Sequence, residues 1–136
     1  MDQIDFKILS LLKDNSRMQW KEIGECIHMT GQAVGNRIRR MEDEGVIEKY
    51  TIVVNELKLG KIIQAFITVF MKSTNHSEFQ AYLKNNTNIV EAHRVSGEGC
   101  YFLKASLSSQ EDLNIILDEI LTFANYRVNL SIGKII

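Results

Sequence analysis

The spacing of apolar residues changes part-way along this chain of 136 residues, and the change limits the folds open to it. Before residue 45 the apolar residues recur at helical intervals, whereas after residue 62 they gather in runs typical of strands. The polar segment NELKLGK lies between the two patterns. We therefore predict an α+β chain, with a first domain over 1–54, a linker over 55–61 and a second domain over 62–136.

Three short helices are expected in the first domain, over 2–14, 19–27 and 31–44. Asp2 can cap the first helix, whose apolar stripe consists of Ile4, Ile8, Leu11 and Leu12. His28–Met29–Thr30 makes a three-residue turn before the third helix, and Thr30 is a good N-cap. Such a pair of helices is typical of a helix-turn-helix module. The segment 46–54 that follows is rich in β-branched residues and is expected to be extended.

A polar and basic face is expected on the third helix. Val34, Ile38 and Met41 share one side, so they would face the core and leave the other side exposed. Glutamine and asparagine can pair with adenine, and arginine can pair with guanine or hold a phosphate. The candidate DNA-binding residues are Thr30, Gln32, Ala33, Gly35, Asn36, Arg37, Arg39 and Arg40. Arg37 and Arg40 are expected to serve DNA binding and not folding, although a solvated helix that binds no DNA can carry the same side chains.

The second domain is expected to have the βαββαβ order of a ferredoxin-like fold. The predicted strands cover 62–72, 88–96, 100–107 and 126–135, and the predicted helices cover 76–85 and 109–124. The first strand is apolar on both faces, because Phe66 and Phe70 alternate with Ala65, Ile67 and Val69. One face can pack on the two helices and the other needs a partner, so we expect a homodimer.

Composition argues against several other classes of protein. The formal net charge of −1 disfavours a uniformly basic nucleic-acid coat. Cys26, Cys100 and the three histidines lie in separate segments, so we expect no metal site, cofactor or disulfide framework. No nucleophile motif or phosphate loop points to an enzyme, although a small enzyme or metabolite-binding module on the second domain stays open. No apolar run is long enough to span a membrane and the first residues are amphipathic, so we expect a cytoplasmic protein.

Several short motifs follow one another in a specific order along the chain. In the first domain they are Asp2-x-x-Asp5-x-x-Ile8-Leu9, Asn15-Ser16-Arg17, Glu22-Ile23-Gly24, Thr30-x-x-x-Val34-x-x-Arg37-Ile38-x-Arg40-Met41-Glu42 and Gly45-Val46-Ile47. In the second domain they are Leu59-Gly60 and Val95-Ser96-Gly97. Together they resemble the Lrp/AsnC family of transcription regulators. The resemblance implies a winged helix-turn-helix domain that binds double-stranded DNA, joined to a ferredoxin-like domain for effector sensing and for assembly of homodimers into octamers.

Gly35 lies inside the predicted third helix, where a glycine costs about 1 kcal/mol relative to alanine. In the family that the chain resembles, this position usually holds a small polar residue on the DNA side. Our hypothesis is that Gly35 lets the helix backbone approach the groove closely. The alternative is that Gly35 relieves a tight crossing with the second helix.

The resemblance also implies a small effector, typically an amino acid, near the turn between the second and third strands of the second domain. The corresponding residues are Gly97, Glu98, Gly99, Cys100 and Ser131. Cys100 stands where the family usually has an acid, and a neutral thiol cannot make a charge-assisted bond to an ammonium group. This departure argues against amino-acid sensing, and a plain hairpin turn is the alternative. The expected function is a sequence-recognising regulator modulated by a small effector, with an architectural DNA-compacting protein as the alternative.

Overall fold

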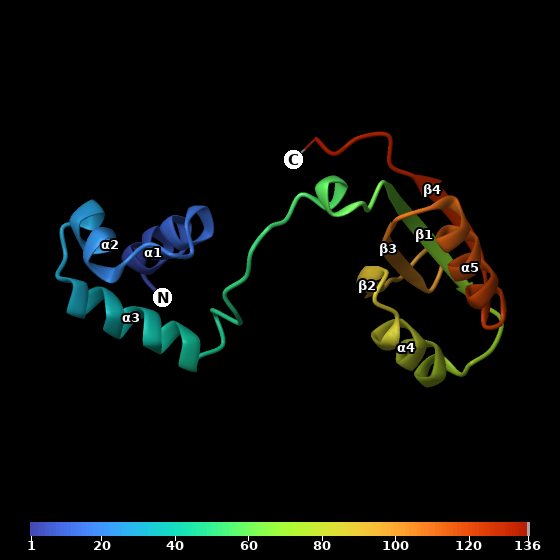
Figure 1. Cartoon of the computed structure of the whole chain (residues 1–136). Helices are drawn as coiled ribbons and strands as arrows, with labels where there is room; N and C mark the ends of the chain where they lie inside the picture. The colour runs from blue at the N-terminus through green and yellow to red at the C-terminus, as the bar shows by residue number, and fades with distance from the viewer. Residues whose placement is uncertain (136) are drawn as a thin grey trace. The chain divides into compact units, whose positions relative to one another are not determined.

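The computed structural model describes residues 1–135, which form two compact units that divide between Val53 and Val54 (Figure 1). The first unit is built from three α-helices, and the second contains a four-stranded sheet and two α-helices. Among the described residues, no helix combines the length and the apolar character that a membrane crossing requires.

One small core holds the three helices of the first unit together. These helices are α1 (Gln3–Asp14), α2 (Trp20–Ile27) and α3 (Gly31–Asp43). Each helix contributes a stripe of apolar residues at helical spacing, as predicted, and the buried members are Ile8, Leu12, Ile23, Val34, Ile38 and Met41. Each fully buried side chain of this size stabilises the unit by roughly 1.5–3 kcal/mol.

The turn between α2 and α3 is the predicted three-residue turn. His28 adopts a left-handed conformation there, with a φ of 59°. Gly24 is pressed against the turn, because a Cβ atom at this position would overlap the carbonyl oxygen of Met29. A Cβ atom on Gly31 would likewise lie 3.2 Å from the backbone nitrogen of Lys21. The two helices and the turn are therefore packed so closely that Gly24 and Gly31 lie directly against backbone atoms.

The segment after α3 was expected to be extended from residue 46, but Val46 and Ile47 bend back, and both N–H groups donate to the carbonyl of Met41. The residues that follow, up to Asn55, form no strand. Gly45, with a φ of 71°, follows the end of α3. Tyr50 attaches the extended segment to α3, because its hydroxyl donates a 2.7 Å hydrogen bond to Oε1 of Glu42. Burial, together with this bond to a carboxylate, raises the pKa of Tyr50 to about 12. Because the segment between α3 and η1 forms no strand, the described part of this single chain contains no pair of strands that would make a wing.

The second unit has the predicted ferredoxin-like βαββαβ fold. Its elements are β1 (Ile63–Met71), α4 (His76–Asn85), β2 (Ile89–Arg94), β3 (Tyr101–Leu107), α5 (Gln110–Leu121) and β4 (Ala124–Leu130). The strands lie in the order β2-β3-β1-β4, and all neighbours are antiparallel. The core lies between one face of the sheet and both helices, where Ile67 of β1 is buried with Phe79 of α4 and Ile116 of α5.

Neither α4 nor α5 covers the other face of the sheet. Phe66 of β1 stacks there on Phe102 of β3, with ring centroids 6.0 Å apart. Phe102 is 40% exposed. The two-faced apolar pattern predicted for the first strand is confirmed, and we call this side of the sheet the open face.

The predicted linker over 55–61 is structured and lies in the second unit. It contains the 3-10 helix η1 (Glu56–Leu59). Glu56 accepts a 3.0 Å hydrogen bond from the hydroxyl of Ser106 on β3, which attaches η1 to the sheet. The extended chain that joins the two units therefore precedes η1 in sequence.

Candidate nucleic-acid interface

The face of α3 opposite the core is polar and accessible. Thr30 caps the helix, because its hydroxyl oxygen accepts a 3.2 Å hydrogen bond from the N–H of Ala33. The first turn of α3 carries no acid. The exposed side chains of the helix are Gln32, Asn36, Arg39, Arg40, Glu42 and Asp43. The N-terminal part of this face is therefore neutral to basic, and the acids lie at its other end.

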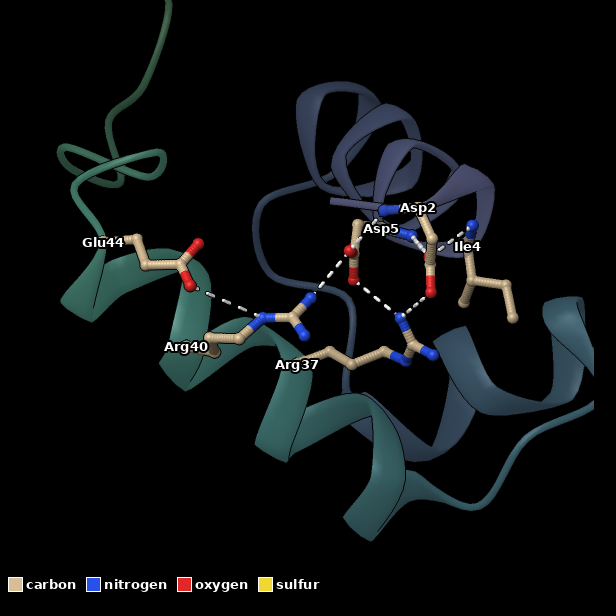
Figure 2. A network of polar contacts seen from close by, with 6 residues as sticks. All are labelled: Asp2, Ile4, Asp5, Arg37, Arg40 and Glu44. Atoms are coloured by element: carbon tan, nitrogen blue, oxygen red, sulfur yellow. Dashed lines mark hydrogen bonds and ion pairs between the residues drawn. The ribbon is translucent and has the colours of Figure 1, made fainter.

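Arg37 lies at the edge of this face, where it is bonded to α1 (Figure 2). Its Nη1 atom is 2.7 Å from Oδ2 of Asp2 and 2.9 Å from Oδ1 of Asp5. The arginine side chain is only 24% exposed, and Asp5 is fully buried. The prediction that Arg37 contributes nothing to folding is wrong, because it compensates a carboxylate that is buried between two helices.

Arg40 takes part in the same network. Its Nη2 atom donates a 2.7 Å hydrogen bond to Oδ2 of Asp5, and its Nε atom lies 3.9 Å from Oε1 of Glu44 (Figure 2). The side chain is 46% exposed, so part of the guanidinium remains accessible. Arg40 thus belongs both to the contact with α1 and to the exposed face. The prediction that Arg40 does not contribute to folding is therefore wrong as well.

Asp2 and Asp5 form a reciprocal capping box at the start of α1. Asp2 accepts hydrogen bonds from the N–H groups of Ile4 and Asp5, while Asp5 accepts one from the N–H of Asp2. The hydrogen bond from Arg37, with that from the N–H of Asp5, lowers the pKa of Asp2 to about 2. Burial opposes ionisation of Asp5, but its bonds to the N–H of Asp2 and to Arg37, with the charge of Arg40, lower its pKa. Both groups are therefore carboxylates at neutral pH.

Gly35 faces α2 and not the exposed side of α3. It is buried, and a Cβ atom there would lie 2.6 Å from Cζ3 of Trp20, the first residue of α2. The hypothesis that Gly35 allows close approach to DNA is therefore wrong, and the alternative of a tight helix crossing describes the structure. The apolar spacing of α3 gives its buried side but does not tell which flank α2 crosses.

Arg39 lies one helical turn after Gly35 and therefore over the same ring. Its Cζ atom is 5.0 Å from the centroid of the Trp20 ring, which is a cation–π distance. Within residues 1–135, the ion pairs of α3 are made by Arg37 and Arg40, and Arg39 has none. Asp2, Asp5 and Trp20 are the contacts of α3 that sequence reasoning missed, because they join residues far apart in the chain.

The other candidates share one accessible surface. Gly35 and Arg37 are directed to the neighbouring helices, as described above. The remaining candidates, which we call the α3 surface, are Thr30, Gln32, Ala33, Asn36, Arg39 and Arg40. All of these are exposed except Ala33, which is half-buried.

Four of the candidate effector residues lie in the turn between β2 and β3. Gly97 and Gly99 have φ angles of 97° and 87°, which favour glycine. Cys100 donates a 2.7 Å hydrogen bond from its N–H to the carbonyl of Val69 on β1. A Cβ atom on Gly99 would lie 2.6 Å from Cγ2 of Thr68, so this position leaves little room for a side chain.

Ser131 does not lie beside this turn within one chain. It follows the end of β4, so its predicted place on the last strand is wrong. Its N–H donates to the carbonyl of Gln64, whereas Cys100 binds the carbonyl of Val69. Gln64 and Val69 are five residues apart on β1, which corresponds to about 17 Å along a strand.

Arg127 of β4 lies near the turn instead. Its Nη1 atom is 3.5 Å from Oε2 of Glu98, and its Cζ atom is 5.9 Å from the centroid of the Phe70 ring. Sequence reasoning missed Arg127, because its position depends on the register of the last strand, in which Arg127 lies opposite Thr68 of β1.

Known proteins share this two-part organisation. Residues 1–48 match a family described as winged helix-turn-helix DNA-binding, and residues 64–134 match the Lrp/AsnC ligand binding domain. The chain is 53% identical to the HTH-type transcriptional regulator LrpB of Bacillus subtilis (strain 168), over 99% of this chain and 91% of LrpB. The chain belongs to the Lrp/AsnC family of transcription regulators. The resemblance inferred from its sequence motifs is confirmed.

Solved structures agree with this assignment. The structure of B. subtilis LrpC has a TM-score of 0.95 at 29% identity, over 99% of this chain and 96% of LrpC. The transcriptional regulator NMB0573 of Neisseria meningitidis, solved as a complex with L-Met, has a TM-score of 0.92 at 23% identity, over 99% and 92% of the two chains. The Lrp/AsnC fold predicted for this regulator is therefore confirmed.

Proposed function

We propose that this Lrp/AsnC regulator recognises double-stranded DNA through the α3 surface. The observation that best supports the proposal is that Gln32, Asn36, Arg39 and Arg40 are accessible on one side of α3, while its other side is buried. In helix-turn-helix proteins the second helix of the pair lies in the major groove, with its N-terminal residues at the base edges.

The exposed side chains suit two different roles. Gln32 and Asn36 lie one turn apart near the start of α3, where amide groups can pair with adenine. Arg39 and Arg40 follow them and can hold phosphates or pair with guanine. Asp43 lies at the far end of the helix, where a carboxylate would repel phosphate. This order of residues favours entry into the groove by the N-terminal turns.

We propose a homodimer, which assembles further to an octamer, as the form that binds DNA. Phe66 and Phe102 on the open face support the dimer, because a paired aromatic surface is stabilised when a second copy covers it. A two-fold interface brings identical patches together, so the open face of one protomer is a suitable partner for that of another. Two helix-turn-helix units would then contact two half-sites on DNA.

A small effector at the turn Gly97–Cys100 is the proposed modulator, and an α-amino acid is the less favoured class. Cys100 offers no carboxylate to an ammonium group, and Glu98 at the turn is already paired with Arg127. Calorimetric titration of amino acids should give little heat with the wild type and tighter binding with Cys100→Asp. The gain should be tenfold or more, since a hydrogen bond to a charged group contributes roughly 1.5–3 kcal/mol. Amino-acid binding that Cys100→Asp leaves unchanged contradicts this assignment.

The DNA-binding function is tested by selecting sequences from a random pool of double-stranded DNA, with and without a mixture of amino acids. We expect enrichment of one motif by the full chain, and loss of that enrichment in Gln32→Ala. Gln110→Ala, at an exposed glutamine of the second unit, is the matched control. Binding without an enriched motif or any effector response would instead identify an architectural protein. Absence of binding at low salt would overturn DNA recognition.

A further inference from the structure

We propose that Trp20 is a positioning residue for DNA binding, because its ring holds the guanidinium of Arg39 ready for a phosphate. This inference rests on the DNA-binding function proposed above. It adds a residue outside α3 to the interface, and it makes Arg39 the principal phosphate contact among the arginines of α3.

The ring of Trp20 has a defined seat on α3. A Cβ atom on Gly35 would lie 2.6 Å from Cζ3 and 3.0 Å from Cδ2 of the ring, so the indole rests directly over this glycine. Any larger residue at Gly35 would lift the ring off the helix. Trp20 nevertheless remains 40% exposed, so part of its ring lies at the protein surface on this flank of α3.

Arg39 is supported by this ring without losing its hydrogen-bond donors. Its Cζ atom lies 5.0 Å from the ring centroid. A cation–π contact attracts the charge of a guanidinium but leaves its N–H groups free, since the ring offers no carboxylate oxygen to accept them. The contact therefore restrains a long side chain that would otherwise lose rotamer freedom when it binds a phosphate.

The arginines of α3 differ in how much charge they can offer to DNA. Arg37 and Arg40 both bind the buried carboxylate of Asp5, which offsets part of their positive charge. Arg39 makes no ion pair within the described chain, so its charge is not offset by a carboxylate in contact with it. The strongest attraction for phosphate on α3 is therefore at Arg39, beside Trp20.

The decisive experiment measures DNA affinity over a series of salt concentrations, with the full chain and a pool of random-sequence duplexes as the probe. Arg39→Ala should reduce the slope of log affinity against log salt by about 1 for each protomer bound to the DNA. Trp20→Leu removes the aromatic face and should weaken binding roughly two- to five-fold, the range for an exposed cation–π contact. Trp20→Phe keeps an aromatic face and should retain most of the wild-type affinity. Arg94→Ala, at an exposed arginine of β2, controls for the loss of one positive charge.

The double variant Trp20→Leu/Arg39→Ala separates positioning from simple packing. If the ring acts through Arg39, Trp20→Leu has no further effect in the Arg39→Ala background. Equal losses in both backgrounds, or a wild-type salt slope in Arg39→Ala, overturn the proposal. Thermal unfolding shows which variants are folded at the assay temperature, and if Trp20→Leu is not folded, the salt slope of Arg39→Ala still decides whether Arg39 is the phosphate contact that the proposal requires. A wild-type chain that binds no duplex at low salt would overturn the DNA-binding function itself.

Discussion

Arg37 of α3 and Asp5 of α1 form a 2.9 Å ion pair whose carboxylate is completely buried. The pair joins the first helix of the chain to the helix that we propose to contact DNA. The orientation of α3 therefore depends on Asp5, which is buried and cannot contact DNA. Arg37 serves mainly to fix the position of α3, whereas Arg39 is available to bind a ligand.

Replacing Arg37 by alanine should lower the free energy of unfolding of the first unit, because Asp5 would stay buried with one guanidinium fewer. Arg39→Ala is the matched control and should change stability by at most about 1 kcal/mol, because it removes only an exposed cation–π contact with Trp20. Urea unfolding followed by the fluorescence of Trp20, the sole tryptophan, reports on the first unit alone. Equal stability of the two variants would contradict the role given to the ion pair.

Acid should destabilise the first unit in a defined pH range. The pKa values of Asp2 and Asp5 are lower in the folded protein than in the unfolded chain, where 3.8 is the ordinary value for aspartate. The contribution of Asp2 to the free energy of unfolding is therefore complete above about pH 4 and is lost as the pH falls through about 2, and Asp5 contributes in the same direction. The same Trp20 measurement should show a shallower fall in Asp2→Asn. An identical pH dependence in both proteins would exclude Asp2 as a source of acid sensitivity.

Gly24→Ala should destabilise the helix-turn-helix by about 1–3 kcal/mol, the usual cost of overpacking. The new methyl group would meet the carbonyl oxygen of Met29, and this backbone atom can move only if the turn moves. Alanine favours the helical conformation by up to about 1 kcal/mol, which is too little to compensate. Urea unfolding measures the change, and a stability equal to or above that of the wild type would show that the turn adapts.

Gly35→Ala should not stabilise α3, although alanine is the better helix former by about 1 kcal/mol. The added methyl group would overlap the ring of Trp20. Because the ring belongs to a side chain, it can move away without a shift of the backbone, so we expect it to be displaced. We expect the fluorescence of Trp20 to move to longer wavelength as the ring becomes more exposed. A gain of a full kcal/mol with an unchanged spectrum would show that the ring does not rest on Gly35.

Phe102→Glu should weaken self-association of the protein by roughly tenfold or more, because an interface would then have to bury an unpaired charge. Phe102 is partly exposed on the open face, so the second unit itself should remain folded. Sedimentation analysis over a range of protein concentrations gives the mass of the wild type and the variant. A wild type that stays monomeric at every concentration would remove the proposed dimer.

Apolar spacing was enough to place most elements of both units. The predicted helix over 76–85 has the limits of α4, and the third helix ends one residue earlier than predicted. Spacing succeeds there because a helix buries one side, so its apolar residues recur with the helical period of about 3.6 residues. It failed for the last strand, which ends at Leu130, because the neighbouring strand β1 begins only two residues before Ala65, the partner of Leu130, so β1 does not extend far enough to pair with the β-like residues after Ser131.

The candidate site was harder to predict, because contacts between distant segments determine which of its residues are buried and which stay accessible. Arg37 and Arg39 stand on either side of Ile38 and look alike in the sequence. Only the crossing of the helices directs one to the acids of α1 and the other to Trp20 of α2. A second signal was available, since two aspartates before an apolar stripe indicate a capping box, but their arginine partners lie more than thirty residues away.

The glycine contacts that close the helix-turn-helix bear on how such regulators diverge after gene duplication. Gly24 and Gly31 meet backbone atoms, so selection for folding opposes change at these positions. Gln32 and Asn36 are exposed, so duplicated copies can change at these proposed base contacts while the scaffold is inherited unchanged. Arg40 is different, because any substitution that alters its proposed contact with DNA also removes a partner of Asp5. New paralogues should therefore vary first at Gln32 and Asn36 and last at Arg40.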